Sequence, residues 1–576
     1  LRLGIGVHHA GMLPRYRRLV ERLVQAGHLR VVCGTDTLGV GVNMPIRTVV
    51  ITGLTKFDGV RSRHLSAREF HQIAGRAGRA GFDTIGDVIV QAPEHVIENA
   101  KLLAKAGDDE KKRRKIVRKK APDGVVNWTD KTFERLRDSD PEPLISQFQV
   151  THAMVLGLLA RPGDPVERGY RLVTDNHEPH REANPHLRRA VSIFRSLHSA
   201  GLVEHTPRSQ TGDGEPTLRL VADVPSDFAL NSPLSPFALA ALDLLDPEAE
   251  PFTRALDVIS VIEATTPGPR PILMAQQHAA RGEAVAAMKS EGLEYEERIE
   301  LLDEVTYPQP LAELLNAAMT TYAAGNPWVT DTELQPKSVV REMVETGMTF
   351  SELVSRYGVQ RSEGVVLRYL TDVYRTMRQV IPEEVRTDEV EDVITWLGEV
   401  VRQVDSSLLD EWEALAGAAD EAADGLTDAE VDAAERRFGD HEAPAPFSAN
   451  TRAVRLAARG AAFRRVELLA REDYVALGQL DADAGWDAAR WREAFDPYFD
   501  EYSDVGTSGA ARAAGLLTIQ ELGRTWRVTQ ILDDPEGDRD WRLVLDVDLD
   551  ASDASGELVI APRALGPSQD VAHIEP

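Results

Sequence analysis

The sequence predicts a multidomain chain that begins with an α/β lobe, continues through largely helical segments and ends in an α+β domain. Its 576 residues are too many for one core, because domains usually hold about 100–200 residues. Short β-branched runs alternate with helical patterns in the first hundred residues, which is typical of an α/β lobe. A second group of strand patterns lies near the C-terminus, after a long stretch of helical patterns.

The composition excludes several classes of protein. With 43% hydrophobic and 27% charged residues, the chain is typical of a soluble globular protein. Its one cysteine, Cys33, excludes an internal disulfide and a Cys-cluster zinc site, so we expect no metal site of that kind and a reducing, cytoplasmic location. The sequence has no run of about 18 apolar residues and no signal-peptide pattern, so we expect neither membrane insertion nor secretion.

The charge is unevenly distributed along the chain. The net charge of −28 argues, taken as a whole, against nucleic-acid binding. Residues 1–80, however, carry 13 Lys and Arg against 4 Asp and Glu, and a dense basic run follows at Lys111–Lys120. Acidic residues then accumulate, especially over Glu383–Glu442. The local charge therefore favours nucleic-acid contact by the N-terminal part, with a solvated linker as the alternative for the basic run.

The first hundred residues predict part of one α/β lobe. Arg15–Ala26 has helical spacing and is ended by Gly27. Three short apolar runs follow, at Leu29–Cys33, Thr48–Thr52 and Asp87–Gln91. Such runs between helices predict buried parallel strands joined by right-handed crossovers.

The next segment predicts helices that lead into a β-ribbon. Gln147–Ala160 and Leu187–Ala200 have helical patterns, and Gly201–His205 and Thr217–Val221 form the ribbon. This order favours a winged helix, and another kind of small α+β domain is the alternative.

The remaining sequence predicts a helical bundle followed by a separate α+β domain. Helical patterns are interrupted by proline near Pro267–Pro271 and Pro308–Pro310, and Gly439–Ala449 has the composition of a linker. Two helices are then predicted, followed by four antiparallel strands: Thr451–Leu477, Trp486–Glu501, Leu516–Glu521, Thr525–Leu532, Trp541–Leu549 and Glu557–Ala561.

The strongest chemical motif is the string QIAGRAGR at Gln72–Arg79. Arg76 and Arg79 are three residues apart at a predicted helix end, where two guanidinium groups suit phosphate oxygens. Glycines in this string leave room for the close approach of a nucleotide. Ser66-x-x-Glu69 is a capping box that predicts where the helix begins.

Two further motifs precede this string. The segment CGTDTLGVGVNMP at Cys33–Pro45 follows a predicted strand, and its small residues would present backbone N–H groups to phosphate. The string HHAGM at His8–Met12 lies upstream. Paired histidines are often packing residues, which is the alternative for His8 and His9.

Together these strings resemble motifs of the second RecA-like lobe of superfamily 2 helicases, and in particular of Ski/Mtr-type DExH-box RNA helicases. The match covers about residues 1–100. Leu144–Leu159 resembles the segment that opens the family's winged helix, and Ser362–Gln379 resembles its ratchet helix. The C-terminal part resembles the extension of an actinobacterial branch, and its last α+β unit is weakly similar to nuclear-transport-factor-like cone folds.

The resemblance implies a division of the chain and roles for its residues. The implied parts are 1–105, a partial second RecA-like lobe; 106–130, a basic linker; 131–232, a winged-helix-like domain; 233–440, a helical bundle; and 450–565, a cone-like α+β domain. Arg76 and Arg79 would be arginine fingers on the ATP γ-phosphate, with Gln72 ordering the site. The remaining implied contacts are with the nucleotide (Gly39, Gly41, Asn43 and Gly75) and with the nucleic-acid backbone (Thr35 and His9).

The sequence contains no Walker A motif and no Asp-Glu-x-Asp/His box, the groups that hold Mg²⁺ and the β- and γ-phosphates in such enzymes. We therefore expect ATP and Mg²⁺ to be held mainly by a first RecA-like lobe in the same polypeptide, outside this sequence. By itself the chain would then be inactive.

The proposed ratchet helix has two faces. One apolar stripe is made of Val366, Leu370, Val373, Met377 and Val380. Arg361, Arg368 and Arg375 recur every seven residues roughly opposite it, so they could contact a phosphate backbone. A solvated polar face is the alternative.

The leading interpretation is the C-terminal portion of an ATP-dependent helicase that acts on single-stranded RNA or DNA. The alternative is a non-catalytic nucleic-acid-binding or scaffold module with a degenerate motor. The acidic C-terminal domain suggests a further contact with a protein partner.

Overall fold

The computed structural model falls into two compact units, Leu1–Gln147 and Phe148–Pro576, and each is described by itself. The described residues are 1–35, 46–57, 61–78, 83–106, 116–120, 126–144, 148–160, 164–175, 180–199, 203–207, 217–220, 234–326, 329, 332–406 and 446–571.

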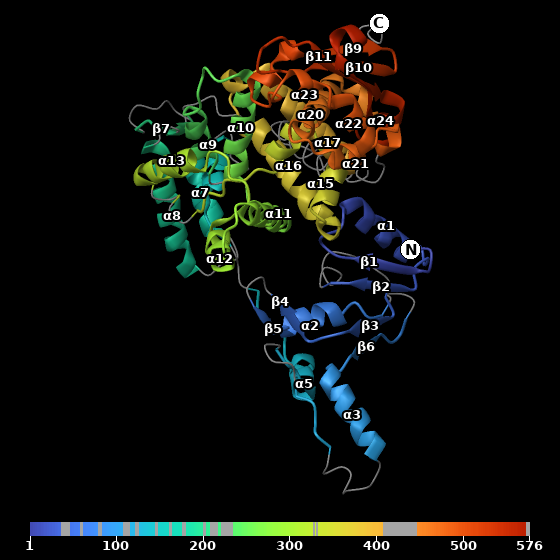
Figure 1. The fold of residues 1–576 in the computed structure, drawn as a ribbon. Coiled ribbons are helices and arrows are strands. Elements are labelled where there is room, and N and C mark those ends of the chain that lie inside the picture. The colour runs from blue at the N-terminus through green and yellow to red at the C-terminus, as the bar shows by residue number, and fades with distance from the viewer. Residues whose placement is uncertain are drawn as a thin grey trace. The chain divides into compact units, whose positions relative to one another are not determined.

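The first unit contains the predicted parallel strands (Figure 1). β1 (Ile5–His8) pairs in parallel with β2 (Val31–Gly34), and α1 (Pro14–Gln25) connects them. β3 (Thr48–Ile51) pairs in parallel with β6 (Asp87–Val90). The predicted α/β character of this part is confirmed, although β1 was not predicted.

Helix α1 packs one face against its own strands. Val20 and Val24 are buried beside Leu29, and burial of such side chains stabilises a fold by roughly 1.5–3 kcal/mol each. Gly6 in β1 permits this packing, because a Cβ there would lie 2.8 Å from the Leu29 side chain and 3.1 Å from that of Val20.

A second core of this unit surrounds α2 (Ala67–Ala74). A short antiparallel hairpin, β4 (Thr55–Phe57) and β5 (Ser62–His64), leads into α2, and α5 (Asp130–Asp138) packs on it. The buried side chains are Ile51, Leu54, Leu65, Phe70, Trp128 and Leu136. Thus α5 belongs to the core of the α/β unit, whereas the sequence placed residues from 131 onward in the next domain. A further helix, α3 (Glu94–Ala106), follows β6.

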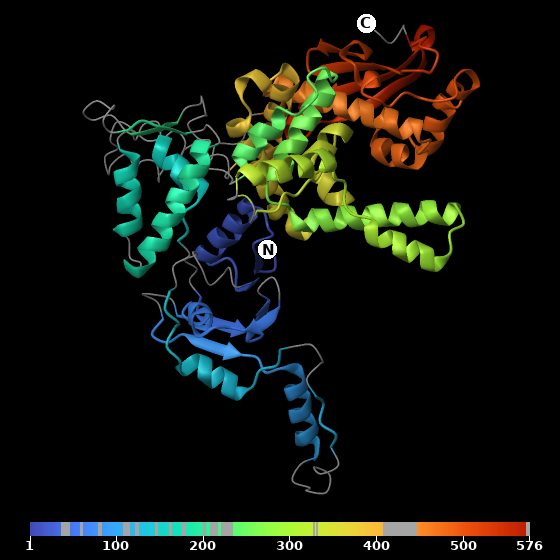
Figure 2. The same ribbon diagram turned by 90° about the vertical axis from the view of Figure 1, so that its left-hand side faces the viewer.

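The second unit begins with three helices and a two-stranded ribbon, here called the α6–β8 module (Figure 2). Its elements are α6 (His152–Ala160), α7 (Pro165–Thr174), α8 (His180–Ser199), β7 (Val203–His205) and β8 (Leu218–Leu220). The strands pair antiparallel, with Val203 opposite Leu220.

Two helix starts in this module differ from the prediction. α6 begins at His152, not at residue 147, because the Thr151 hydroxyl accepts a hydrogen bond from the Met154 N–H (3.2 Å) and so acts as the cap. α8 begins seven residues before the predicted start at Leu187 and contains Pro185 near its N-terminal end.

A helical bundle follows. Its long and short helices are α9 (Ser235–Leu242), α10 (Pro251–Thr265), α11 (Arg270–Ser290), α12 (Tyr295–Glu304), α13 (Ala312–Gly325), α14 (Val340–Thr346), α15 (Phe350–Arg356), α16 (Glu363–Val380) and α17 (Asp388–Asp405). The predicted break at Pro267–Pro271 falls at the junction of α10 and α11, with Pro271 in the first turn of α11, and that at Pro308–Pro310 falls between α12 and α13. α11 and α12 form a hairpin that projects from the other helices (Figure 2).

The C-terminal part combines helices with one antiparallel sheet, as predicted. Its elements are α20 (Thr451–Ala470), α21 (Tyr474–Asp481), α22 (Ala488–Phe495), α23 (Tyr498–Glu501), β9 (Leu517–Leu522), β10 (Thr525–Ile531), β11 (Trp541–Asp548), α24 (Leu549–Ser555), β12 (Ile560–Pro567) and α25 (Ser568–Val571). The strand order is β12-β11-β10-β9.

Two long helices predicted in this part are each broken in the structure. The prediction over 451–477 is divided between α20 and α21, because Glu472 adopts a left-handed conformation with φ of 52°. The prediction over 486–501 is divided between α22 and α23 at Asp496 and Pro497, where Pro497 supplies no N–H to continue the first helix.

The C-terminal part packs on the bundle within one compact unit, and its division from the bundle as a separate domain stays a prediction. α20 lies against both α14 and α17. Gly347 and Gly460 permit this packing, since a Cβ on Gly347 would lie 2.2 Å from the Ala461 nitrogen. Gly347 also has φ of 59°, which a side chain would strain.

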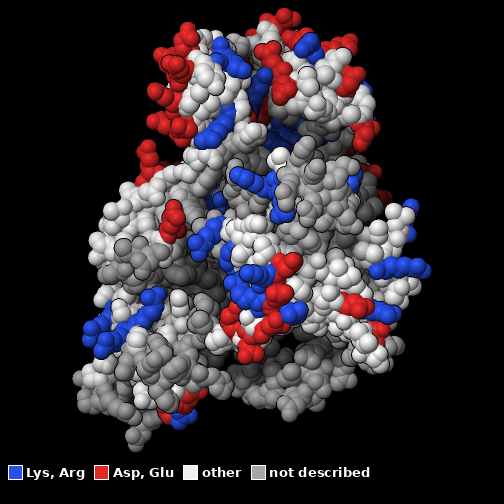
Figure 3. Space-filling model, turned by 90° about the horizontal axis from the view of Figure 1, so that it is seen from below, with Lys and Arg blue, Asp and Glu red and all other residues white. Residues whose placement is uncertain are grey.

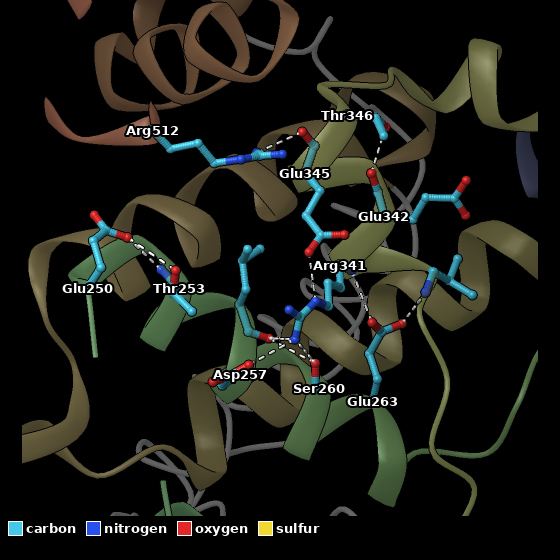
Figure 4. Close-up of polar contacts among 12 residues, drawn as sticks. Glu250, Thr253, Asp257, Ser260, Glu263, Arg341, Glu342, Glu345, Thr346 and Arg512 are labelled. Atoms are coloured by element: carbon cyan, nitrogen blue, oxygen red, sulfur yellow. Dashed lines mark hydrogen bonds and ion pairs between the residues drawn. The ribbon is translucent and has the colours of Figure 1, made fainter. Parts of the chain in front are cut away.

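A polar cluster joins α14 to α10 and to Arg512 of the C-terminal part (Figure 4). Arg341 on α14 donates to the Asp257 carboxylate on α10 (2.9 Å) and to Glu345 (2.8 Å). Arg512 donates to the Glu345 carbonyl (3.0 Å). The buried Glu263 accepts from the backbone N–H groups of residues 339–341 at the start of α14, and burial raises its pKa. Since these polar groups are hydrogen-bonded to one another, the cluster stabilises one arrangement of the helices.

Among the helices of the described ranges, none has both the length and the apolar composition needed to cross a membrane.

Candidate functional site

Helix α2 carries the motif residues, and its start is the predicted capping box. The Ser66 hydroxyl accepts from the Glu69 N–H (3.1 Å), and the Glu69 carboxylate accepts from the Ser66 N–H (2.8 Å). Two of the N–H groups that have no partner within the helix are thereby satisfied. The sequence prediction of this helix start is confirmed.

The same Glu69 carboxylate binds the hairpin that precedes α2. Arg63 on β5 donates two hydrogen bonds to it, each 2.8 Å long, and the Lys56 ammonium lies 3.3 Å away. The Arg63 guanidinium is the main reason that the pKa of Glu69 is lowered to about 2. The helix is therefore fastened to the hairpin by a paired, partly buried carboxylate.

A second carboxylate, that of Glu142, holds the start of α2 from the other side. It accepts hydrogen bonds from the N–H groups of Ala67 (2.9 Å) and Arg68 (2.8 Å), and the Arg68 side chain donates to the Glu142 carbonyl. The Arg68 backbone hydrogen bond is the largest cause of the lowered pKa of Glu142. A negative group at a helix N-terminus also interacts favourably with the helix dipole. Sequence reasoning missed Glu142, because it lies 75 residues from its partner and has no local signal.

The C-terminal end of α2 and the turn after it carry two of the three predicted catalytic residues, Gln72 and Arg76. Gln72 is exposed on the helix, Gly75 is the C-cap residue, and Arg76 lies half-buried in the turn that follows. The helix ends at Ala74, so Arg76 lies beyond its last turn. Arg79 lies outside the described residues, as do Gly39, Gly41 and Asn43.

The glycines of this turn are explained by the backbone. Gly78 has φ of 96°, a conformation that favours glycine, and its N–H donates to the Ile46 carbonyl (2.8 Å). Gly86 passes so close that a Cβ on it would lie 2.4 Å from the Ala77 carbonyl carbon. Folding alone therefore requires Gly78 and Gly86, whereas the sequence analysis explained the glycines of the motif by the approach of a nucleotide.

His9 and Thr35 lie next to each other in the topology of the sheet. Each follows the last residue of a strand in the parallel pair β1–β2, in which His8 is opposite Gly34. The Thr35 N–H donates to the His8 carbonyl (3.4 Å). Ligands of open parallel sheets bind outside this carboxyl edge. His9 and Thr35 therefore lie at this edge, and their contact with nucleic acid stays a prediction.

The two neighbouring histidines differ in their surroundings. His8 is buried, and its Nε2 lies 2.8 Å from the Glu21 carboxylate on α1. His9 is less buried, and its Nδ1 accepts a hydrogen bond from the Gly11 N–H (3.2 Å). The packing alternative thus applies to His8, and His9 is left at the edge of the sheet.

Part of the basic run is attached to α3. Asn99 exchanges two hydrogen bonds with the backbone of Lys119, and the Lys119 ammonium pairs with Glu98 at 2.8 Å. Residues 111–115 lie outside the described part of the chain. The positive charge of Lys119 is therefore paired with an acidic residue of the same unit.

The predicted two faces of α16 are present in the second unit. The side chains of Val366, Leu370, Val373, Met377 and Val380 are fully buried. Arg361, in the short 3₁₀ turn before the helix, and Arg368 are exposed, while Arg375 is half-buried. Asp372 lies between the last two arginines on this face, and burial raises its pKa while both arginines oppose that shift.

On the face shown in Figure 3, lysine and arginine side chains of the described residues gather in separate groups beside acidic ones. Nucleic-acid contact therefore has to be argued from local groups, since no single field of one sign covers that face. Among the described residues, no group of three or more His, Cys, Asp or Glu side chains could hold a metal ion.

Two family models match the chain. The helicase conserved C-terminal domain matches residues 2–81, and a domain of unknown function (DUF3516) matches residues 92–565. The chain thus carries a helicase C-terminal domain, a part of superfamily 2 helicases, which are ATP-dependent enzymes.

Similar proteins are also helicases or helicase-related proteins. The chain is 48% identical over 94 residues to the ATP-dependent RNA helicase mtr4 of Schizosaccharomyces pombe, covering 16% of this chain and 8% of that protein. It is 37% identical over 159 residues to superkiller complex protein 2 of Mus musculus, and 35% identical over 159 residues to the antiviral helicase SKI2 of Saccharomyces cerevisiae. Each of these two matches covers 28% of this chain and 10% of the relative. The matches therefore span about a tenth of the relatives' length.

Proposed function

The chain belongs to the family of the domain of unknown function DUF3516, here preceded by a helicase C-terminal domain, and from this we propose that it is part of an ATP-dependent superfamily 2 helicase acting on RNA, or alternatively on DNA. In this proposal the first unit is the second motor lobe. A first RecA-like lobe, which would hold ATP and Mg²⁺, is supplied by a segment outside this sequence.

The observation that carries the proposal is the way in which α2 is held. Glu69 and Glu142 fasten the beginning of the helix, and the close contact of Gly86 with the backbone after Ala77 fixes the turn beyond its end. A rigidly held turn is what an arginine finger requires, because catalysis by a positive charge depends on its being in place before the reaction. Arg76 would contact the γ-phosphate from this turn, with Gln72 beside it, and we assign the same role to Arg79, which lies outside the described residues.

Residues at the edge of the sheet would contact nucleic acid. His9 and Thr35 follow adjacent parallel strands, and their side chains can donate hydrogen bonds to phosphate oxygens. Gly39, Gly41 and Asn43 would line the cleft between the motor lobes. ATP supplies the energy of the cycle when bound. His9 and Thr35 would change their contacts with the strand as the cleft closes and opens.

The second unit would add further contacts. The α6–β8 module has the helix and ribbon order of a winged helix, and α16 exposes Arg361 and Arg368 on the side opposite its buried stripe. We assign Arg361, Arg368 and Arg375 to the backbone of a single strand, as in a ratchet helix. Arginine suits this role because its charge is permanent and its fork matches phosphate.

The test is steady-state ATPase activity of the complete protein with saturating RNA, measured beside nucleotide affinity. Arg79→Ala should abolish the RNA-stimulated activity and leave ATP binding largely intact, because an arginine finger acts on the transition state. Arginine fingers contribute roughly 10³–10⁵ in rate. Arg76→Ala should act similarly, and Arg79→Lys should restore little activity.

Arg22→Ala is the matched control, since Arg22 is an exposed arginine on α1 of the same unit. This variant should turn over ATP normally. Near-normal turnover by Arg79→Ala would contradict the motor assignment and favour the non-catalytic scaffold.

A further inference from the structure

Helix α8 is locally basic within a strongly acidic chain. From His186 to His205 the sequence contains three arginines and three histidines against one acidic residue, Glu204, although the whole chain carries 93 Asp and Glu against 65 Lys and Arg. A basic segment kept within an acidic protein marks a place where negative charge can be attracted.

Two arginines of α8, Arg188 and Arg195, lie on its exposed side. Ile193, Ser196 and Leu197 are buried and attach the helix to its module. Arg188, Val191, Ser192 and Arg195 are all exposed and recur at helical spacing on the other side. Arg189 differs from them, since its Nε donates to the Val150 carbonyl (2.8 Å) and it therefore contributes to packing.

These exposed residues line an open groove. It has a volume of about 520 Å³, and the described residues that line it are Leu187, Arg188, Val191, Ser192 and Arg195. Among the described residues, neither Arg188 nor Arg195 forms an ion pair with an acidic side chain. The two arginines are seven positions apart, so their Cα atoms lie about 10.5 Å apart along the helix axis.

We propose that this face of α8 is a nucleic-acid-binding site that takes the phosphate backbone of the substrate, separate from the contacts of the motor lobe and of α16. Two guanidinium groups can each bind phosphate oxygens, and the Ser192 hydroxyl between them can donate a further hydrogen bond. Among the described residues that line the groove, none is aromatic and Val191 is the one exposed large apolar residue. A protein partner would need buried aromatic or apolar anchors, so the composition favours a phosphate backbone.

The first experiment measures binding of the full chain without nucleotide. Fluorescence anisotropy would be recorded with a labelled 20-nucleotide single-stranded RNA and with the corresponding duplex, between 50 and 200 mM KCl. For Arg188→Glu/Arg195→Glu we expect weaker binding and a log–log salt slope smaller by about 1.4 for the single strand, at about 0.7 per lost phosphate contact. When the salt concentration rises fourfold over this range, the affinity of the variant for the single strand should therefore fall by a factor about sevenfold smaller than that of the parent.

Matched variants separate local contact from total charge and from misfolding. Lys289→Glu/Arg298→Glu on α11 and α12 changes the net charge by the same amount and should leave the slope unchanged. Arg188→Gln/Arg195→Gln removes the contacts without reversing charge, so it should lower the slope even if the glutamate variant fails to fold. The two RNA probes distinguish a single strand from a duplex as the source of the phosphates.

A crosslinking experiment locates the contact independently. Ser192→Cys in a Cys33→Ser background gives a single thiol on the proposed face, which a benzophenone maleimide would label. Irradiation should crosslink this protein to RNA, whereas Ala286→Cys, at an exposed position of α11, should not crosslink.

Two results would overturn the assignment. One is a salt slope that neither the glutamate nor the glutamine variant changes, together with no crosslink at residue 192. The other is binding of poly-glutamate, with no effect of the variants on RNA, which would assign the face to an acidic protein. Because no ATP is used, neither result depends on whether Arg76 and Arg79 act in turnover.

Discussion

Removing the charge of Glu69 should loosen the helix that carries the proposed arginine fingers. The Glu69 carboxylate accepts two hydrogen bonds from Arg63 and one from the Ser66 N–H. Glu69→Gln keeps the shape of the side chain but removes the charge on which these interactions depend. The first turn of α2 should then open more often, and the turn that contains Arg76 should become less well fixed.

The magnitude follows from the pKa of this carboxyl group. A decrease from 4.5 to about 2 corresponds to about 3.4 kcal/mol of stabilisation when the group is charged, at about 1.36 kcal/mol per unit. The side chains of Glu69 and Arg63 are 21% and 36% exposed, so solvent screening reduces this value. We expect a loss of about 1–2 kcal/mol at neutral pH, which is roughly a 5- to 30-fold change in an opening equilibrium.

The assay is hydrogen–deuterium exchange of peptides that cover α2, with variant and parent compared at the same pH. At pH 7 the α2 amides of Glu69→Gln should exchange roughly 5- to 30-fold faster. Because the folded-state pKa is depressed, the stabilisation in the parent is present above about pH 4.5 and is lost as the pH falls towards 2. The difference between the two proteins in the free energy of opening α2 should therefore shrink by about half by pH 3.

Glu94→Gln is the control, since Glu94 is an exposed acid in the first turn of α3 in the same unit. It should leave exchange in α2 unchanged. The reasoning would be refuted if Glu69→Gln exchanged like the parent at pH 7, or if its faster exchange persisted undiminished at pH 3.

Three other perturbations test separate parts of the molecule. Arg368→Glu should impair unwinding by the complete protein but keep its melting temperature. Leu370→Asp should unfold the bundle, because an unpaired charge in a fully buried position costs several kcal/mol. Equal loss of melting temperature in circular dichroism would show that the arginine face is structural. Changing all basic residues of Lys111–Lys115 to serine should flatten the salt dependence of single-strand binding by the chain, and an unchanged slope would mark a solvated linker. Glu142→Gln should speed exchange at the first turn of α2 and lower kcat of the complete protein more than it changes KM, while Glu142→Asp should recover part of both effects; normal exchange would exclude the contact.

Local sequence determined the elements whose signals lie within a few residues of one another. The capping box from Ser66 to Glu69 is one such signal, since both partners lie within one helical turn. The amphipathic pattern of α16 is another, because the 3.6-residue period by itself separates the buried stripe from the arginines. The parallel strands β2, β3 and β6 were also predictable from their short β-branched runs, but most of their residues are exposed and not buried as the sequence predicted.

Tertiary structure decided the features that depend on partners distant in sequence. Glu142 caps α2 across 75 residues, and α5 joins the core of the α/β unit instead of the next module, because each finds its partner only after the chain has folded back. The same holds for the packing of α20 on the bundle, which needs Gly347 and Gly460 to meet. His8 and His9 show the limit most simply. They are identical and adjacent in sequence, and only the alternation of a strand next to α1 buries the first and leaves the second at the edge of the sheet.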